Sequence, residues 1–192
     1  MPHDDAGAIE RARAGDGRAF EQLARELEVP LYRHVLRVVG TPAEAEDVVQ
    51  DAFISAWRSI GSFQGGSFRA WVFRIATNRA IDTIRARRRR GEVPLEPPED
   101  QDVEWAEPVA PGPDPEELAS RREDLAAVEE ALTTLPPEQR AALVLRDIEG
   151  FSYEEIAQMT AVEIGTVKSR IHRGRVAVRN VLVGRGWRSA AG

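Results

Sequence analysis

A proline-rich, acidic segment divides the chain and limits what it can fold into. Residues 91–117 carry ten acidic and no basic side chains, and six prolines lie within 91–114. Such a segment repels itself and contains too little apolar surface to fold alone. We therefore expect a flexible linker at 91–114 between two domains, 1–90 and 115–192. A plain spacer is the simpler interpretation of this linker, and a polyanion that occupies a channel built for nucleic acid is the alternative.

The two flanking parts are predicted to be helical. Their apolar residues recur at three- and four-residue steps, which is the spacing of the buried face of a helix. Thr41 and Asp114 each precede a proline and then a glutamate at the third position, and Ser67 precedes an apolar run. Each of them marks a helix start. No strand-like alternation appears in the sequence, so the predicted fold is all-α, with two small helical domains.

Composition excludes several classes of site. The chain has no cysteine, which excludes disulfides, thiolate metal sites and cysteine nucleophiles. Its histidines, His3, His34 and His172, are far apart and lack a ligand-like spacing, so we expect no metal and no cofactor. No apolar run approaches about twenty residues and the N-terminus is polar and acidic. We therefore expect no membrane insertion, no signal peptide and a cytoplasmic location.

Residues 151–175 predict two short helices joined by a tight turn. Ser152 and Glu155 have the spacing of a capping box, which starts the first helix. The second helix, from about residue 164 past residue 175, separates an apolar side from a polar, cationic side. The apolar side is Val167, Ile171, Gly174 and Val178, and the other is Gly165, Lys168, Ser169, His172 and Arg173. This pattern is typical of a helix-turn-helix whose second helix enters a DNA major groove, and an ordinary helical hairpin is the alternative.

A polar strip is predicted on the helix that follows Thr41. Asp47, Gln50 and Asp51 fall within one helical turn, opposite an apolar face. A strip of this kind is usually a solvated surface. A role in binding a partner needs a further argument.

Aromatic residues alternate with arginine and asparagine between residues 61 and 90. The loop 61–66 holds Phe63, and the helix after Ser67 carries several arginines, Asn78 and Trp71. Rings stack on unpaired bases while guanidinium groups hold phosphates, so this composition suits single-stranded DNA. For Trp71, a core position and a stacking platform both remain open.

At residues 43–90 and 132–175 the chain resembles the alternative sigma factors of bacterial RNA polymerase, in the extracytoplasmic-function (ECF) group. The first block, AEAEDVVQDAF to IRARRRR, is similar to region 2, which binds polymerase and recognises the minus-10 element. The second, LTTLPPEQ to SRIHRGR, is similar to region 4, which recognises the minus-35 element. The resemblance implies a stress-response sigma factor that binds RNA polymerase core, aids DNA melting, performs no catalysis and is controlled by an anti-sigma factor.

The resemblance also implies residue roles. The strip Asp47, Gln50 and Asp51 matches the surface that docks on the clamp helices of the largest polymerase subunit. Phe63 and its loop match the element that captures a flipped minus-10 base of the non-template strand. The implied minus-10 residues are Phe63, Trp71, Phe73, Arg74, Asn78 and Asp82. The implied minus-35 residues are Lys168, Ser169, His172 and Arg173. The linker matches the segment that threads toward the active-site cleft of polymerase.

The turn of the helix-turn-helix departs from the family pattern. Thr160, Ala161 and Glu163 stand where an apolar residue, a glycine and commonly a proline are usual. An alanine in a left-handed conformation costs about 1–2 kcal/mol, so we expect a reshaped or softer turn. Glu163 favours the positive end of the following helix but repels a nearby phosphate.

Two other classes of function fit parts of the sequence. A stand-alone helix-turn-helix regulator would bind duplex operators without polymerase, but it leaves the strip around Asp47 and the loop at Phe63 without a role. An enzyme is the weaker alternative, since no nucleophile–base pair, carboxylate dyad or metal cluster can be picked out.

Overall fold

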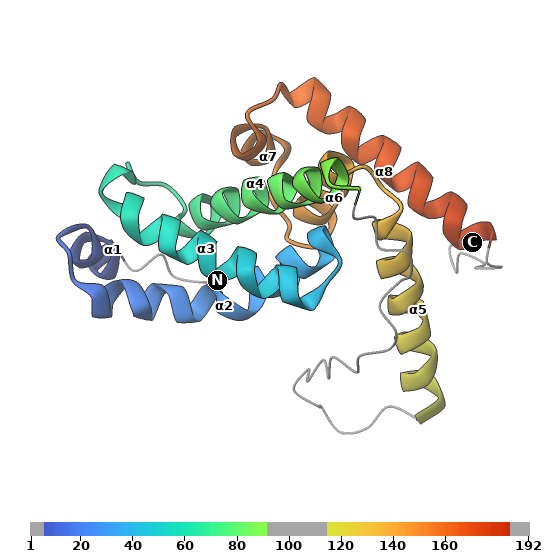
Figure 1. Ribbon diagram of the computed structural model, residues 1–192, viewed down its shortest axis with the longest axis horizontal. Coiled ribbons are helices and arrows are strands. Elements are labelled where there is room, and N and C mark those ends of the chain that lie inside the picture. Colours follow the sequence, from blue (N-terminus) through green and yellow to red (C-terminus); the bar gives the residue numbers. More distant parts are fainter. Residues whose placement is uncertain (1–5, 92–114, 185–192) are drawn as a thin grey trace.

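A computed structural model describes residues 6–91 and 115–184, with the side chains of 115–122 left out. Within these ranges all regular structure is helical, which confirms the predicted all-α class. The predicted linker, apart from Gly91, lies outside the described residues. Figure 1 shows α2, α3 and α4 running roughly along one another, with α6 and α7 beside α4 and α5 extending away.

The N-terminal part consists of four α-helices and a short 3-10 turn within residues 6–91. They are α1 (Ala6–Arg13), α2 (Gly17–Val39), α3 (Pro42–Ser59), η1 (Ile60–Ser62) and α4 (Phe68–Arg89). Asp16 starts α2 by accepting hydrogen bonds from two backbone N–H groups, and Ser67 starts α4 by accepting one from Ala70 at 3.1 Å. Gly40 ends α2 in the left-handed conformation, with φ of 89°.

The capping box predicted at Thr41 is wrong. The Thr41 side chain makes no hydrogen bond to the backbone of α3, and its hydroxyl instead donates to the Glu44 carboxylate at 2.8 Å. Pro42 still occupies the first turn, where its fixed φ suits a helix and the missing N–H costs nothing. The helix therefore starts where predicted, by a different contact.

The C-terminal part contains α5 (Pro115–Thr133), α6 (Pro137–Asp147), α7 (Tyr153–Thr160) and α8 (Ile164–Gly184). The helical spacing of apolar residues predicts Leu125 and Ile148 as core positions, and both predictions are wrong, because Leu125 is 60% exposed and Ile148 is 46% exposed. Figure 1 shows α5 extending away from the other helices, so Leu125 has no layer to pack against. Ile148 follows the last residue of α6, at the point where the chain leaves the helix.

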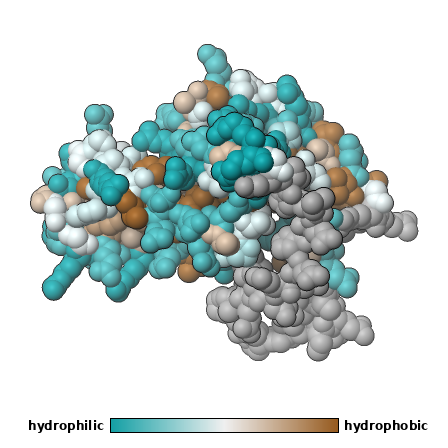
Figure 2. All heavy atoms as spheres, viewed as in Figure 1, coloured by the Kyte–Doolittle hydropathy of each residue, from teal (hydrophilic) through white to brown (hydrophobic). Residues whose placement is uncertain are grey.

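The two parts share one continuous hydrophobic core. Phe73 of α4 is fully buried and its ring centroid lies 5.4 Å from that of Phe151, which precedes α7. Arg140 of α6 is 4% exposed and donates to the Val38 carbonyl at the end of α2 at 2.8 Å. Figure 2 shows a surface that is largely hydrophilic on the side facing the viewer, with separated apolar patches.

One polar pair is buried in this core. His34 Nε2 lies 2.8 Å from the Thr77 hydroxyl, and both residues are fully buried. Burial, together with the nearby cations Arg69 and Arg37, lowers the pKa of His34 to about 3. The imidazole is therefore neutral at physiological pH.

Candidate nucleic-acid and partner interfaces

One face of α8 is packed against the neighbouring helices. Val167 and Ile171 are buried, and Gly174 lies so close to α6 that an added Cβ would be 3.4 Å from Leu143. The small residue at Gly174 therefore lets two helices approach closely. This is the apolar side that the sequence predicts.

The opposite face of α8 carries the four residues predicted to bind the minus-35 element. Lys168, His172 and Arg173 are exposed, and Ser169 is half-buried with its hydroxyl donating to the Thr166 carbonyl at 2.9 Å. The predicted division of this helix into a packed and an exposed face is confirmed. The contacts of these side chains with DNA remain predictions.

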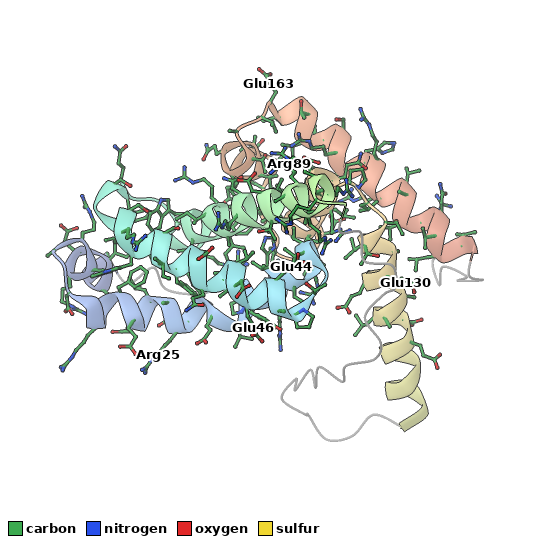
Figure 3. All side chains as sticks on the ribbon, in the orientation of Figure 1. Arg25, Glu44, Glu46, Arg89, Glu130 and Glu163 are labelled. Atoms are coloured by element: carbon green, nitrogen blue, oxygen red, sulfur yellow. The ribbon has the colours of Figure 1, made fainter. Side chains whose placement is uncertain are left out.

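The turn between α7 and α8 keeps the left-handed conformation at Ala161, although the sequence predicts a reshaped or softer turn. Ala161 has φ of 52° and ψ of 44°, and its N–H donates to the Ala157 carbonyl. The N–H of Val162 donates to the same carbonyl at 3.1 Å, so the helix end is closed without a glycine. Glu163 is exposed and points outward from this turn (Figure 3).

The capping box at the start of α7 is confirmed. Ser152 accepts from the Glu155 N–H at 3.1 Å, and the Glu155 carboxylate accepts from the Ser152 N–H at 2.8 Å. Two N–H groups that lack helical partners are satisfied in this way. The start of α7 is therefore fixed at Ser152.

Nothing in the sequence pattern pointed to an aromatic and cationic cluster beside the recognition helix. The guanidinium of Arg146 lies 4.7 Å from the ring centroid of Tyr153, and the Lys168 ammonium lies 5.8 Å from it. Both distances are within the range of cation–π attraction. Tyr153 thus lies within cation–π distance of one cation of α6 and one cation of α8.

The polar strip on α3 is on the surface. Asp47 and Gln50 are exposed. Asp51 accepts hydrogen bonds from Arg79 of α4 at 2.6 and 3.1 Å, so this carboxylate is already paired within the chain. The strip therefore offers one unshielded carboxylate, Asp47, and one amide, together with an ion pair.

A groove of about 910 Å³ lies between α2 and α3 and reaches this strip. Gln50 belongs to both, while Phe53 and Ile54 of α3 face Val29 and Tyr32 of α2 across the groove. Val29 and Ile54 are 56% and 41% exposed. An exposed apolar groove beside an acidic strip is suited to an amphipathic helix of a partner.

Phe63 lies inside an aromatic cluster. It is 4% exposed, and its ring centroid lies 5.9 Å from that of Phe68 and 5.3 Å from that of Trp71. Trp71 is half-buried, so it serves the core and also presents part of its indole at the surface. The Phe63 ring is not accessible to a base in this conformation, whereas Gln64 beside it in the loop is exposed.

Phe73 is one of the implied minus-10 residues, and helical spacing predicts it on the surface of α4, but this prediction is wrong. Its exposure is 0%, and its ring packs between His34, at 5.1 Å, and Phe151, at 5.4 Å. A helical wheel of α4 alone includes neither His34 of α2 nor Phe151, which precedes α7. Burial of Phe73 is a consequence of packing between the two parts.

The remaining predicted minus-10 residues lie on the exposed side of α4. Arg74 and Asp82 are exposed, and Asp82 forms an ion pair with Arg85 at 3.6 Å. Asn78 is exposed too, but its amide donates to the Met159 carbonyl of α7 at 3.2 Å. One predicted DNA-binding side chain is therefore engaged by the C-terminal part.

Two family models match the chain in the order that the fold presents them. Sigma-70 region 2 matches residues 23–90, and sigma-70 region 4 matches residues 125–178. The ECF RNA polymerase sigma-E factor of Escherichia coli K12 is 37% identical over 183 residues, which cover 92% of this chain and 93% of that protein. This chain belongs to the ECF sigma factors.

Other relatives agree with this assignment. The RNA polymerase sigma-H factor of Pseudomonas aeruginosa is 39% identical over 186 residues, which cover 93% of each chain. The ECF sigma factor SigE of Mycolicibacterium smegmatis is 43% identical over 165 residues, which cover 85% of this chain. The match spans only 62% of the length of SigE.

Solved structures of similar fold come from complexes. CnrH, in complex with the cytosolic domain of CnrY, has a TM-score of 0.66 and 28% identity, covering 92% of this chain and 96% of CnrH. RpoE of Bartonella quintana, in complex with the anti-sigma factor NepR, has a TM-score of 0.61 and 31% identity, covering 84% of this chain and 97% of RpoE. The described part of this sigma factor contains no helix able to cross a membrane and no group of three or more acidic or histidine side chains placed to hold a metal ion.

Proposed function

We propose that this ECF sigma factor binds RNA polymerase core, directs it to promoters with minus-35 and minus-10 elements, and assists strand opening. Region 2 is residues 1–90, the linker is 91–114 and region 4 is 115–192. The protein has no catalytic activity of its own, because the reaction belongs to polymerase. The observation that carries this proposal is that regions 2 and 4 occur in order and that α8 presents its cationic face to solvent.

Region 4 supplies the upstream contact. Lys168, Ser169, His172 and Arg173 lie on the exposed face of α8, near the N-terminal end that enters a major groove in helix-turn-helix proteins. The ammonium and guanidinium groups bind phosphates or guanine edges, and the hydroxyl adds a short donor. Tyr153 keeps Lys168 close to α7.

Region 2 supplies the docking surface for polymerase. The clamp helices of the largest subunit bind along Asp47, Gln50 and Asp51, with the α2–α3 groove receiving apolar side chains beside them. An exposed carboxylate, an exposed amide and an apolar groove on one side of the molecule support this assignment. Docking places α4 next to the melted strand.

The minus-10 contacts come from α4 and the loop before it. Trp71, Arg74, Asn78 and Asp82 present stacking, cationic and hydrogen-bonding groups along one helix. The buried ring of Phe63 shapes the loop that receives the flipped base, and Phe73 supports the helix from within. Binding of an unpaired strand in this way offsets the energy of unstacking its bases.

An anti-sigma factor is the proposed negative regulator. RpoE, a structural neighbour of this chain, is found in complex with the anti-sigma factor NepR. A protein that covers the docking strip on α3 would exclude polymerase. Because its polymerase partner is cytoplasmic, we place the protein in the cytoplasm.

Two assays test the proposed function together. The purified protein is mixed with sigma-free core polymerase, and the complex is isolated by gel filtration. The same mixture then transcribes a template with a pre-melted bubble and a duplex promoter template. A stable complex and sigma-dependent run-off product are the expected results. Duplex DNA binding without any affinity for core would instead identify a stand-alone regulator.

A further inference from the structure

An exposed ion pair joins the polar strip of α3 to α4. The Arg79 guanidinium donates from both Nε and Nη2 to one carboxylate oxygen of Asp51, Oδ2, at 3.1 and 2.6 Å. Within the part of the chain that the structure describes, Asp51 Oδ1 accepts no hydrogen bond and Arg79 has no second acidic partner. Each of the two side chains therefore depends on the other for its ionic contact.

This pair lies at the border between two proposed binding surfaces. Asp51 belongs to the strip that we assign to polymerase, and Arg79 directly follows Asn78 on the helix that we assign to the minus-10 strand. The two helices lie side by side (Figure 1), so one side chain from each meets between them. The carboxylate can therefore bind a cation of polymerase, and the guanidinium can bind a phosphate of DNA, only in competition with each other.

The exposure of the pair makes such an exchange cheap. The side chains of Arg79 and Asp51 are 56% and 47% exposed, and water screens the attraction between charges at a surface. A second pair between the same helices, Arg87 with Glu44 at 2.6 Å, is only 14% and 25% exposed. Breaking that shielded pair would leave a poorly hydrated charge, whereas breaking the pair of Arg79 with Asp51 would not.

We propose that Arg79 is a further strand-binding residue, which binds a backbone phosphate once a cation of polymerase takes its partner, Asp51. The proposal rests on the proposed docking role of Asp51 and the proposed minus-10 role of α4. A guanidinium offers a phosphate the same fork of donors that it offers a carboxylate, so its N–H groups stay paired through the exchange.

The exchange couples polymerase docking to strand binding. A cation on Asp51 makes Arg79 available to DNA, and a phosphate on Arg79 makes Asp51 available to polymerase. Because this coupling is reciprocal, each partner strengthens binding of the other by the same factor. An ion pair at the surface limits that factor to about fivefold.

The docking half of the proposal is tested by titrating core polymerase without DNA. Arg79→Ala should bind core more tightly, by up to about fivefold, because Asp51 no longer has a competing partner. In the Asp51→Ala background the same substitution should have no effect. The matched control is Arg13→Ala, which breaks an exposed pair with Glu10 at 3.1 Å on α1 and should leave core affinity unchanged.

An unchanged core affinity of Arg79→Ala would overturn the exchange. A lower affinity would overturn it too, since it would mean that Arg79 holds Asp51 in place for docking. Both substituted side chains are exposed, and circular dichroism checks that each variant is folded.

The strand-binding half is tested with the holoenzyme and labelled single-stranded DNA of randomised sequence, over a series of salt concentrations. Loss of one phosphate contact should lower the slope of log affinity against log salt by about 0.7 in Arg79→Ala, which is about fivefold weaker binding at about 0.1 M salt. Arg79→Lys keeps the charge and should keep the slope, as should Arg13→Ala. Contacts that core itself makes with DNA are common to all these holoenzymes and cancel.

An unchanged slope in the Arg79→Ala holoenzyme would overturn the phosphate contact. Failure of the proposed function is distinguishable from this result, because it would appear as absence of any complex between core and the unmodified chain. A chain that binds core normally but shows no effect of Arg79→Ala contradicts the exchange alone.

Discussion

At the scale of residues, single side chains on the exposed face of α8 test the proposed contact of region 4 with duplex DNA. Lys168 is exposed at the N-terminal part of the helix and lies near the ring of Tyr153. A cation held there meets either a phosphate or a base edge when the helix enters the groove. The side chain is thus a sensitive probe of how the helix is seated.

Replacing Lys168 with alanine should weaken binding to minus-35 duplex by about 1–3 kcal/mol, because one phosphate or base contact is lost. Fluorescence anisotropy with labelled duplex at fixed salt measures the effect. Arg179→Ala removes an exposed cation farther along α8 and should change binding less. Equal losses in the two variants would show that only net charge matters.

Ala161 is the one described residue other than glycine with positive φ. Ala161→Gly should raise the free energy of unfolding by about 1 kcal/mol, since glycine adopts the left-handed conformation without the steric cost. Ala126→Gly, in the exposed interior of α5, should lower it by about 1 kcal/mol. Urea unfolding followed by circular dichroism compares them. A destabilised Ala161→Gly variant would mean that the turn carries no strain.

His34 should make the fold sensitive to mild acid. Its pKa is about 3 in the folded chain and about 6.5 when unfolded, so the unfolded state takes up a proton first as the pH falls. Stability is therefore complete above about pH 6.5 and is lost toward pH 3, by roughly 1.4 kcal/mol per pH unit. His34→Leu should flatten the part of this dependence between pH 6.5 and 5, where few carboxylates titrate. An unchanged slope in urea unfolding would contradict burial of a neutral imidazole.

At the scale of elements, α3 has a packed face and, opposite it, an exposed polar face to which we assign partner binding. Its small residues Ala45, Ala52 and Ala56 are buried against α2 and α4, while Asp47 and Gln50 face solvent. A change on the outer face should therefore affect binding without affecting the fold.

Asp47→Lys should abolish or strongly weaken core binding, because a carboxylate facing the clamp helices is replaced by a cation. Affinity for core is measured by fluorescence titration, and circular dichroism checks the fold. Glu10→Lys makes the same charge change on α1, at a 74% exposed side chain far from the strip, and should bind core normally. Adding Asp51→Lys should lower the affinity for core further. This second substitution also breaks the ion pair between Asp51 and Arg79. Unchanged core affinity would refute the docking role.

At the scale of the whole molecule, local patterns predicted the elements but not their assembly. The all-α class, the capping box at Ser152 and the two faces of α8 follow from spacing and residue type within one helix, and the structure confirms them. The burial of Phe73 depends on Phe151, which precedes α7 and lies far away in the sequence, so no helical wheel of α4 contains it. The prediction for Leu125 is wrong in the opposite sense. Its spacing predicts burial, but no other described helix packs against that part of α5, so the side chain is exposed.

In the candidate sites, too, the sequence predicts which residues are exposed but not the contacts between the two regions. Residues on outward faces, such as Asp47, Lys168 and Arg173, are exposed as their spacing predicts. The contact of Asn78 with Met159 joins two regions and leaves no trace in either sequence block. The contact between the two regions is therefore visible only in three dimensions.

Mapping of transcription start sites tests the central claim most directly. Core polymerase with and without this protein transcribes fragmented genomic DNA of its source organism, and the 5′ ends of the transcripts are sequenced. New start sites that share one motif near minus 10 and another near minus 35 are the predicted result, and Lys168→Ala should weaken the selection of the upstream motif. The same set of start sites with and without the protein would contradict the account.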